Sequence, residues 1–185
     1  MSQTKIGIIA SGSGSNAEAI MEACESGILN GLAEVVTLIC NKNGAYCLER
    51  AQNHGIPCIL IESEGFDGTR EEFDRRLVAE LTSAGVNVVC LAGYMRLVSN
   101  YFLQQFPGAV MNIHPALLPA FPGMHAHQDA IAYGVKVSGC TVHFVDEDTD
   151  HGPIIIQKAV PVYDDDTEET LGERVLQFEH KIYPQ

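Results

Sequence analysis

Short apolar runs alternate with amphipathic stretches from residue 5 to residue 114. The apolar runs predict buried strands, and apolar residues spaced three and four apart predict helices. The predicted strands are 5–10, 35–40, 58–61, 86–92 and 109–114. The predicted helices between them are 16–24, 45–54, a stretch of about 14 residues that starts after Thr69, and 99–106. Gly55 is placed to end the second helix, and Thr69 with Glu72 forms a capping box for the third.

The pattern changes after a proline-rich loop at 115–123. A short helix at 128–133 precedes two strands, 138–145 and 153–162, which an acidic loop at 146–152 separates. A closing helix at 167–182 carries on one face Leu171, Val175, Phe178 and Ile182. Neither a repeat nor a linker interrupts the pattern. It therefore predicts one α/β domain over residues 1–185, with a mostly parallel sheet whose two later strands pair antiparallel.

Composition narrows the classes of function. Hydrophobic residues make up 46% of the chain and charged residues 19%, which is enough apolar material for a core. The net charge of −13 argues against binding to nucleic acid or to anionic membranes, although a small anionic ligand stays compatible with it. No apolar run is long enough to span a membrane, and the first residues lack the features of a signal peptide.

The cysteines point to a reducing compartment. None of the six belongs to a C-x-x-C pair, and several lie in apolar segments: Cys24, Cys40, Cys47, Cys58, Cys90 and Cys140. We therefore expect reduced, buried thiols in a cytoplasmic protein. The alternative, a catalytic cysteine, has no support from neighbouring residues.

The segment 11–17 is a glycine-rich loop between a predicted strand and a helix, a position typical of a phosphate site. Gly12, Gly14 and Ala17 also fit a dinucleotide-binding fingerprint. That fingerprint needs a carboxylate at the end of the second strand, and this strand ends in Cys40-Asn41-Lys42. A phosphate site is therefore favoured over a nicotinamide site or a turn without a ligand.

Asn112 and His114 lie two residues apart at the end of a predicted strand, so their side chains point to the same face. Asn112 can donate a hydrogen bond to a developing oxyanion, and His114 can carry protons near neutral pH. A lone histidine is more often a core residue with satisfied hydrogen bonds. The pair, followed by a proline-rich segment, favours a catalytic function.

The acidic loop 146–152 is either a solvated turn or a metal-binding loop. It lacks the spacing and the closing glutamate of an EF-hand. Asp150 precedes a His-Gly-Pro segment that suggests a fixed backbone position, so Asp150 is the candidate functional carboxylate. A zinc site is not favoured, because no common structural zinc site has the spacing of these four histidines: His125, His127, His143 and His151.

Five segments together resemble the phosphoribosylglycinamide formyltransferases, the folate-dependent enzymes of purine synthesis: 11–16, 91–96, 112–119, 150–153 and 179–184. The resemblance covers Ile6 to Pro184. It implies a Rossmann-like, doubly wound α/β fold of the formyltransferase type. It also implies direct transfer of the formyl group of 10-formyltetrahydrofolate to the amine of glycinamide ribonucleotide, through a tetrahedral intermediate and without a metal.

The same resemblance implies roles for individual residues. The catalytic residues would be Asn112, His114 and Asp150. The residues that bind the ribonucleotide would be Gly14, Ser15, Asn16, Leu176, Gln177, Phe178 and Glu179, with Glu179 on the polar side of the closing helix. The residues that bind the folate would be Arg70, Met95, Arg96, Leu97, Val98, Asn112, Asp146, Glu147, Asp148, Thr149 and Asp150. The small-molecule substrates would be the only partners of a monomer or homodimer.

Three other functions remain alternatives. A formyltetrahydrofolate deformylase would be expected to carry an N-terminal regulatory domain, whereas here the first strand begins at residue 5. A methionyl-tRNA formyltransferase would need a basic RNA-binding extension. A nucleotide-binding module without formyl chemistry would leave Asn112, His114 and Asp150 without a purpose.

Overall fold

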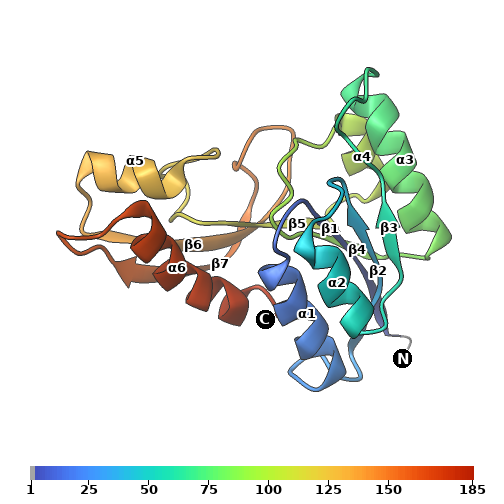
Figure 1. Cartoon of the computed structure of the whole chain (residues 1–185), viewed down its shortest axis with the longest axis horizontal. Helices are drawn as coiled ribbons and strands as arrows, with labels where there is room; N and C mark the ends of the chain where they lie inside the picture. Colours follow the sequence, from blue (N-terminus) through green and yellow to red (C-terminus); the bar gives the residue numbers. More distant parts are fainter. Residues whose placement is uncertain (1–2) are drawn as a thin grey trace. The chain divides into compact units, whose positions relative to one another are not determined.

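The structure, a computed structural model, describes residues 3–185 and divides into two compact units (Figure 1). The first unit extends to Met111 and includes Pro184, and the second comprises Asn112–Tyr183 and Gln185. None of the helices within residues 3–185 is both long and apolar enough to cross a membrane.

The first unit contains parallel strands connected by helices. Its elements are β1 (Thr4–Ala10), α1 (Ser15–Glu25), β2 (Ala33–Cys40), α2 (Tyr46–Asn53), β3 (Cys58–Leu60), α3 (Arg70–Ser83), β4 (Val88–Leu91) and α4 (Asn100–Gln105), followed by β5 (Val110–His114), which ends in the second unit. Strand β1 pairs in parallel with β2 and β4, and β2 pairs in parallel with β3. All predicted elements are present, with most ends moved by one or two residues.

The first unit contains the buried strand, the helix cap and the helix end that the sequence predicts. Ile8 and Ile9 of β1 are completely buried, as expected of a strand covered on both faces. The Thr69 hydroxyl accepts a hydrogen bond from the backbone N–H of Glu72, and the Glu72 carboxylate accepts one from the Thr69 N–H at 2.7 Å. Gly55 follows α2 with a φ of 68°. The predicted capping box and helix end are confirmed.

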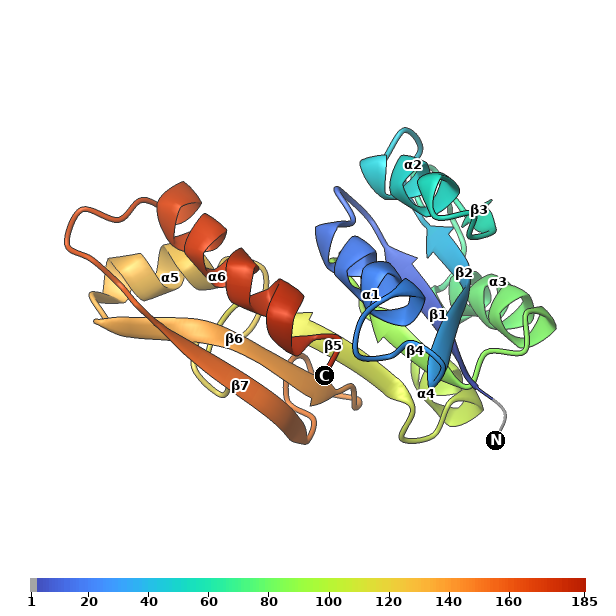
Figure 2. The same cartoon turned by 90° about the horizontal axis from the view of Figure 1, so that it is seen from below.

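The second unit contains an antiparallel pair of strands with two helices. Its elements are α5 (Ala126–Tyr133), β6 (Val137–Phe144), β7 (Ile154–Pro161) and α6 (Glu168–Ile182). Strands β6 and β7 pair antiparallel, which confirms the prediction for the two later strands. Helix α6 packs on both strands and also contacts α5 (Figure 2).

One detail of α6 differs from the prediction. Leu171, Val175 and Ile182 are buried as predicted, but Phe178 is only half-buried. The carboxylate of Glu179, expected on the polar side, lies on the buried side with 6% of the residue exposed. The reason is the helical period of about 3.6 residues. Position 179 lies about one turn after Val175 and therefore on the same buried face of the helix.

The seven strands form one mixed sheet in the order β3-β2-β1-β4-β5-β6-β7. From β1 the chain first builds the sheet outward on one side with β2 and β3. It then returns to the other side of β1, where β4 pairs with β1. This is the arrangement of a doubly wound α/β fold, and it confirms the predicted fold class. In such sheets ligands bind at the carboxyl ends of the parallel strands. The Gly12 loop directly follows β1, and His114 is the last residue of β5.

Candidate active site

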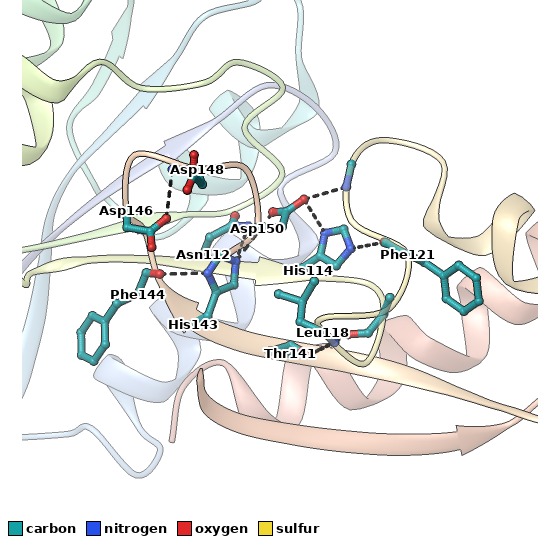
Figure 3. A network of polar contacts seen from close by, with 12 residues as sticks. Asn112, His114, Leu118, Phe121, Thr141, His143, Phe144, Asp146, Asp148 and Asp150 are labelled. Atoms are coloured by element: carbon teal, nitrogen blue, oxygen red, sulfur yellow. Dashed lines mark hydrogen bonds and ion pairs between the residues drawn. The ribbon is translucent and has the colours of Figure 1, made fainter. Parts of the chain in front are cut away.

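His114, the last residue of β5, is buried and lies between two hydrogen-bond acceptors (Figure 3). Its Nδ1 is 3.3 Å from Oδ2 of Asp150, and its Nε2 is 2.8 Å from the carbonyl oxygen of Phe121. Carbonyl and carboxylate oxygens accept hydrogen bonds and cannot donate them. Each ring nitrogen therefore faces an oxygen that can accept a hydrogen bond. The fold brings Asp150 to His114 from 36 positions along the chain.

Two strained backbone positions hold these acceptors in place. Phe121 has a φ of 52° and Asp150 a φ of 51°, a left-handed conformation that costs non-glycine residues about 1–3 kcal/mol. The Asp150 carboxylate also accepts a hydrogen bond from the backbone N–H of Gly123 at 2.8 Å. Strain of this kind concentrates at functional sites, where the surrounding structure fixes a rare conformation.

Asn112 contacts a second buried histidine that sequence reasoning had named only as a zinc candidate. The side-chain nitrogen of Asn112 is 3.2 Å from Nε2 of His143, and Nδ1 of His143 is 2.9 Å from the carbonyl oxygen of Phe144. Burial lowers the pKa of His143, so its ring is neutral near pH 7. The available signal was a histidine at the end of an otherwise apolar strand.

Hydrogen bonds to β6 and β7 anchor the proline-rich loop that carries Phe121. The hydroxyl of Thr141, completely buried in β6, donates to the carbonyl of Ala116 at 2.7 Å and accepts from the N–H of Leu118 at 3.1 Å. The side-chain amide of Gln157 donates to the Leu118 carbonyl at 2.9 Å and to the Thr141 hydroxyl at 3.0 Å. This network fixes the start of the loop relative to His114.

We expect Thr141→Val to lower the free energy of unfolding by about 3 kcal/mol, because valine has the same shape but leaves the buried carbonyl of Ala116 and the buried N–H of Leu118 without this hydrogen bond. Chemical denaturation of this variant and of Thr82→Val, an exposed position on α3, measures the difference. Equal stability of the two variants would show that the buried hydroxyl does not anchor the loop.

The acidic loop 146–152 forms a turn closed by its own side chains. The Asp146 carboxylate accepts hydrogen bonds from the N–H of Asp148 at 3.1 Å and from Nδ1 of His151 at 3.0 Å, and the second of these raises the pKa of His151. A Cβ atom at Gly152 would lie 1.9 Å from the carbonyl oxygen of Phe144, so only glycine fits there. This close approach explains the fixed backbone position after Asp150.

The loop residues themselves are largely open to solvent. Asp146 is half-buried and the next three residues are exposed: Glu147, Asp148 and Thr149. Within residues 3–185, no group of three or more His, Cys, Asp or Glu side chains is placed to hold a metal ion.

The glycine loop of the first unit leads into α1, which begins at Ser15 with Gly14 as its N-cap. Gly14 has a φ of 75°, and a Cβ atom there would lie 2.4 Å from the Cβ of Cys47 on α2. The N–H of Cys47 donates to the carbonyl of Gly12 at 3.1 Å, which joins the loop to α2. Asn16 is buried and Ser15 half-buried at the N-terminus of α1, where helices present N–H groups to anions.

The segment after β4 is tied to the same loop. The N–H of Met95 donates to the Ser11 hydroxyl at 2.9 Å. Met95 is 60% exposed and Leu97 49% exposed, so this segment leaves apolar side chains open to solvent. Arg96 and Val98 are half-buried, and Arg70 is the exposed first residue of α3.

The predicted ribonucleotide-binding residues of α6 lie on different sides of the helix. Gln177 is exposed, Leu176 and Phe178 are half-buried, and Glu179 is buried. Glu179 also contributes to the raised pKa of Cys140 on β6, after the larger effect of burial. The carboxylate is therefore held within the second unit.

All six cysteines are free thiols in the structure, and four of them are buried. A hydrogen bond with Cys47 lowers the pKa of Cys40 to about 7. Both residues are completely buried, so neither thiol can reach a substrate in this conformation. A catalytic cysteine gains no support from their placement.

Known proteins resemble the chain in sequence. The family model for formyl transferase matches residues 4–185. Phosphoribosylglycinamide formyltransferase of Bacillus subtilis is 43% identical over 180 residues, which cover 97% of this chain and 91% of the relative. The trifunctional purine biosynthetic protein adenosine-3 of Drosophila melanogaster is 43% identical over 97% of this chain, but the chain spans only 13% of that relative.

Solved structures give the same result. Glycinamide ribonucleotide transformylase 1 of Symbiobacterium toebii superimposes with a TM-score of 0.94 at 47% identity, over 98% of this chain and 84% of the other. Phosphoribosylglycinamide formyltransferase of Bacillus halodurans has a TM-score of 0.92 at 44% identity, over 98% of this chain and 92% of the other. The chain therefore belongs to the formyl transferase family.

Proposed function

We propose that this chain is a phosphoribosylglycinamide formyltransferase, which transfers the formyl group of 10-formyltetrahydrofolate to the amine of glycinamide ribonucleotide in de novo purine biosynthesis. The observation that carries the proposal is the placement of His114 between Asp150 and Phe121, in a member of the formyl transferase family. Two relatives that match this chain over most of their own length are named phosphoribosylglycinamide formyltransferase, and this supports the choice of substrate. On this proposal residues 1–185 act as one formyltransferase domain.

The reaction joins the amine nitrogen to the formyl carbon and breaks the bond from that carbon to the folate nitrogen. The tetrahedral intermediate carries negative charge on the formyl oxygen. An N–H of Asn112 and the protonated ring of His114 stabilise this oxyanion. His114 gives its proton to the departing nitrogen as the bond to the folate breaks, and the ring then takes up the proton that the amine nitrogen loses. Asp150 orients the ring through the contact between its carboxylate and Nδ1. No covalent enzyme intermediate is needed.

The binding residues follow the same proposal. Gly14, Ser15 and Asn16 hold the phosphate of the ribonucleotide at the N-terminus of α1, and the segment 176–179 contacts its ribose. The folate supplies the formyl group, and its flat ring system suits the exposed apolar side chains of the segment 95–98. The loop 146–150 and Arg70 complete the folate site. A cytoplasmic location and a monomeric or homodimeric state remain predictions.

We expect Glu179→Gln to raise KM for glycinamide ribonucleotide at least ~10-fold, about 1.4 kcal/mol, with KM for the folate nearly unchanged. Glutamine keeps the volume of this buried side chain but replaces one acceptor oxygen by an NH2 donor, so that the side chain loses its charge and one of the two oxygens that would accept hydrogen bonds from ribose hydroxyls. Steady-state kinetics with each substrate varied measures both constants. Glu173→Gln, at an exposed position of the same helix, is the control. Equal losses for both substrates would point to a disturbed helix instead.

The experiment that tests the function is incubation with 10-formyltetrahydrofolate alone, with glycinamide ribonucleotide or with methionyl-tRNA, while the loss of the formyl group is followed. Loss that depends on the ribonucleotide supports the proposal. Loss without any amine would identify a deformylase, and loss only with methionyl-tRNA would identify that formyltransferase instead. If the protein binds a nucleotide but the formyl group is not lost under any condition, the protein is a nucleotide-binding module without formyl chemistry.

A further inference from the structure

We propose that His143 is a positioning residue that sets which end of the Asn112 side-chain amide faces the reacting carbon. The inference rests on the proposed formyl transfer, since it concerns the group that stabilises the oxyanion. His143 would act through Asn112 and touch no substrate atom itself. The residues that carry the inference all lie in the second unit.

The hydrogen bonds of His143 define its tautomer. Its Nδ1 lies 2.9 Å from the carbonyl oxygen of Phe144, and a carbonyl can only accept, so Nδ1 carries the proton. In the neutral ring Nε2 then has a lone pair. That lone pair faces the side-chain nitrogen of Asn112 at 3.2 Å, so Asn112 donates and His143 accepts. Figure 3 shows the ring between these two partners.

This tautomer distinguishes the two ends of the Asn112 amide. With Nδ2 held at His143, one N–H is bound and the second N–H of the same nitrogen is available to the formyl oxygen. A flipped amide would place its oxygen against the lone pair of Nε2, which is repulsive, and would exchange donor and acceptor positions at the reacting carbon. An acceptor facing the developing oxyanion would raise the barrier that a donor lowers.

Protonation of His143 would reverse this preference. An N–H at Nε2 would oppose the N–H of Asn112 and would instead be satisfied by the Asn112 oxygen or by Oδ1 of Asp150, which lies 3.7 Å away. The change from neutral imidazole to imidazolium therefore favours the flipped amide. His143 and Asn112 form a two-state element whose equilibrium depends on pH.

Several groups decide the charge of His143, which is 2% exposed. Burial has the largest effect and lowers its pKa, and His114 lowers it further. Three other groups raise the pKa of His143: the Phe144 carbonyl, Asp150 and Asp146. Because the net effect lowers the pKa, the neutral ring persists below the usual value of about 6.5. The correct amide orientation is therefore present above the lowered pKa of His143 and is lost as the pH falls through that pKa.

Nitrogen NMR of the histidine rings tests the tautomer directly and needs no substrate. In the wild-type protein at neutral pH we expect His143 to carry its proton on Nδ1. On acidification, the side-chain amide signals of Asn112 should move with the titration of His143. A proton on Nε2 at neutral pH, or Asn112 signals that ignore the titration, would overturn the inference.

Two variants then test the consequence for catalysis. His143→Leu removes the acceptor, and kcat should fall roughly 10²-fold with both KM values little changed. His143→Gln offers an oxygen to Asn112 and does not titrate, so it should retain most of kcat and lose the acid inflection of His143 from the pH–rate profile. The control is His54→Leu, a histidine on the first unit bound to Glu25.

The outcomes separate this inference from the proposed function. An inactive wild-type protein would refute formyl transfer, while the NMR result would still decide the tautomer. An active wild-type protein with undiminished kcat in a folded His143→Leu variant would refute the positioning role. If His143→Leu does not fold by circular dichroism, the decision rests on His143→Gln, in which an unchanged acid inflection would contradict the inference.

Discussion

Replacing Asp150 with Asn lowers kcat by roughly 10²-fold or more, while both KM values stay close to those of the wild type. The carboxylate of Asp150 lies 3.3 Å from Nδ1 of His114, where its negative charge strengthens the hydrogen bond from the ring. An amide oxygen can still accept the Gly123 hydrogen bond but supplies no charge. The charge matters mainly in the transition state, so the loss falls on kcat.

The substitution is well suited to isolate charge from structure. Asp150 has a φ of 51°, a conformation that asparagine adopts more readily than most residues, so the backbone of the loop should persist. The pH–rate profiles of both proteins, with circular dichroism as a fold check, give the comparison. Asp165→Asn, an exposed position of the same unit, controls for the loss of one negative charge. A near-normal kcat with an unmoved acidic limb would make Asp150 a turn residue only.

Gly14→Val is expected to lower the free energy of unfolding by about 3 kcal/mol or more, and the loss of ribonucleotide affinity would follow from the damaged loop. The left-handed φ of 75° already disfavours any β-branched residue. In addition, the new Cβ would lie 2.4 Å from the Cβ and 2.7 Å from the Cα of Cys47, and a backbone atom cannot move aside cheaply.

Gly12→Ala is the matched variant in the same loop, because a Cβ atom at Gly12 meets nothing within 4 Å. Its stability should stay close to that of the wild type. Thermal and chemical unfolding of both variants measures the contrast. A Gly14→Val protein as stable as Gly12→Ala would contradict the close packing of the loop on α2.

These two glycines illustrate what the sequence could and could not predict. Their position between a strand and a helix predicted the loop, because both signals are local. The reason for Gly14 could not be read from the sequence. In the structure, a side chain at Gly14 would collide with Cys47, which stands 33 positions later in the chain. Contacts between distant residues leave no periodic signal in the chain.

The candidate site follows the same division. Asn112 and His114 could be identified because two polar side chains share one face at the end of an apolar strand. The carbonyl of Phe121 could not be, since any residue has a carbonyl and only the fold directs this one at His114. His143 was visible as a residue but not as a partner of Asn112, because the contact needs the pairing of separate strands.

The most direct test of the central claim is to trace a carbon-13 label from the formyl group of 10-formyltetrahydrofolate. In the presence of glycinamide ribonucleotide, the wild-type protein should place the label in a new formamide on the ribonucleotide. Asp150→Asn should form the same product at roughly 10⁻² of the rate or less. Carbon NMR distinguishes that formamide from free formate. Label released as formate, with or without the ribonucleotide, would contradict the assignment of this chain as a formyltransferase.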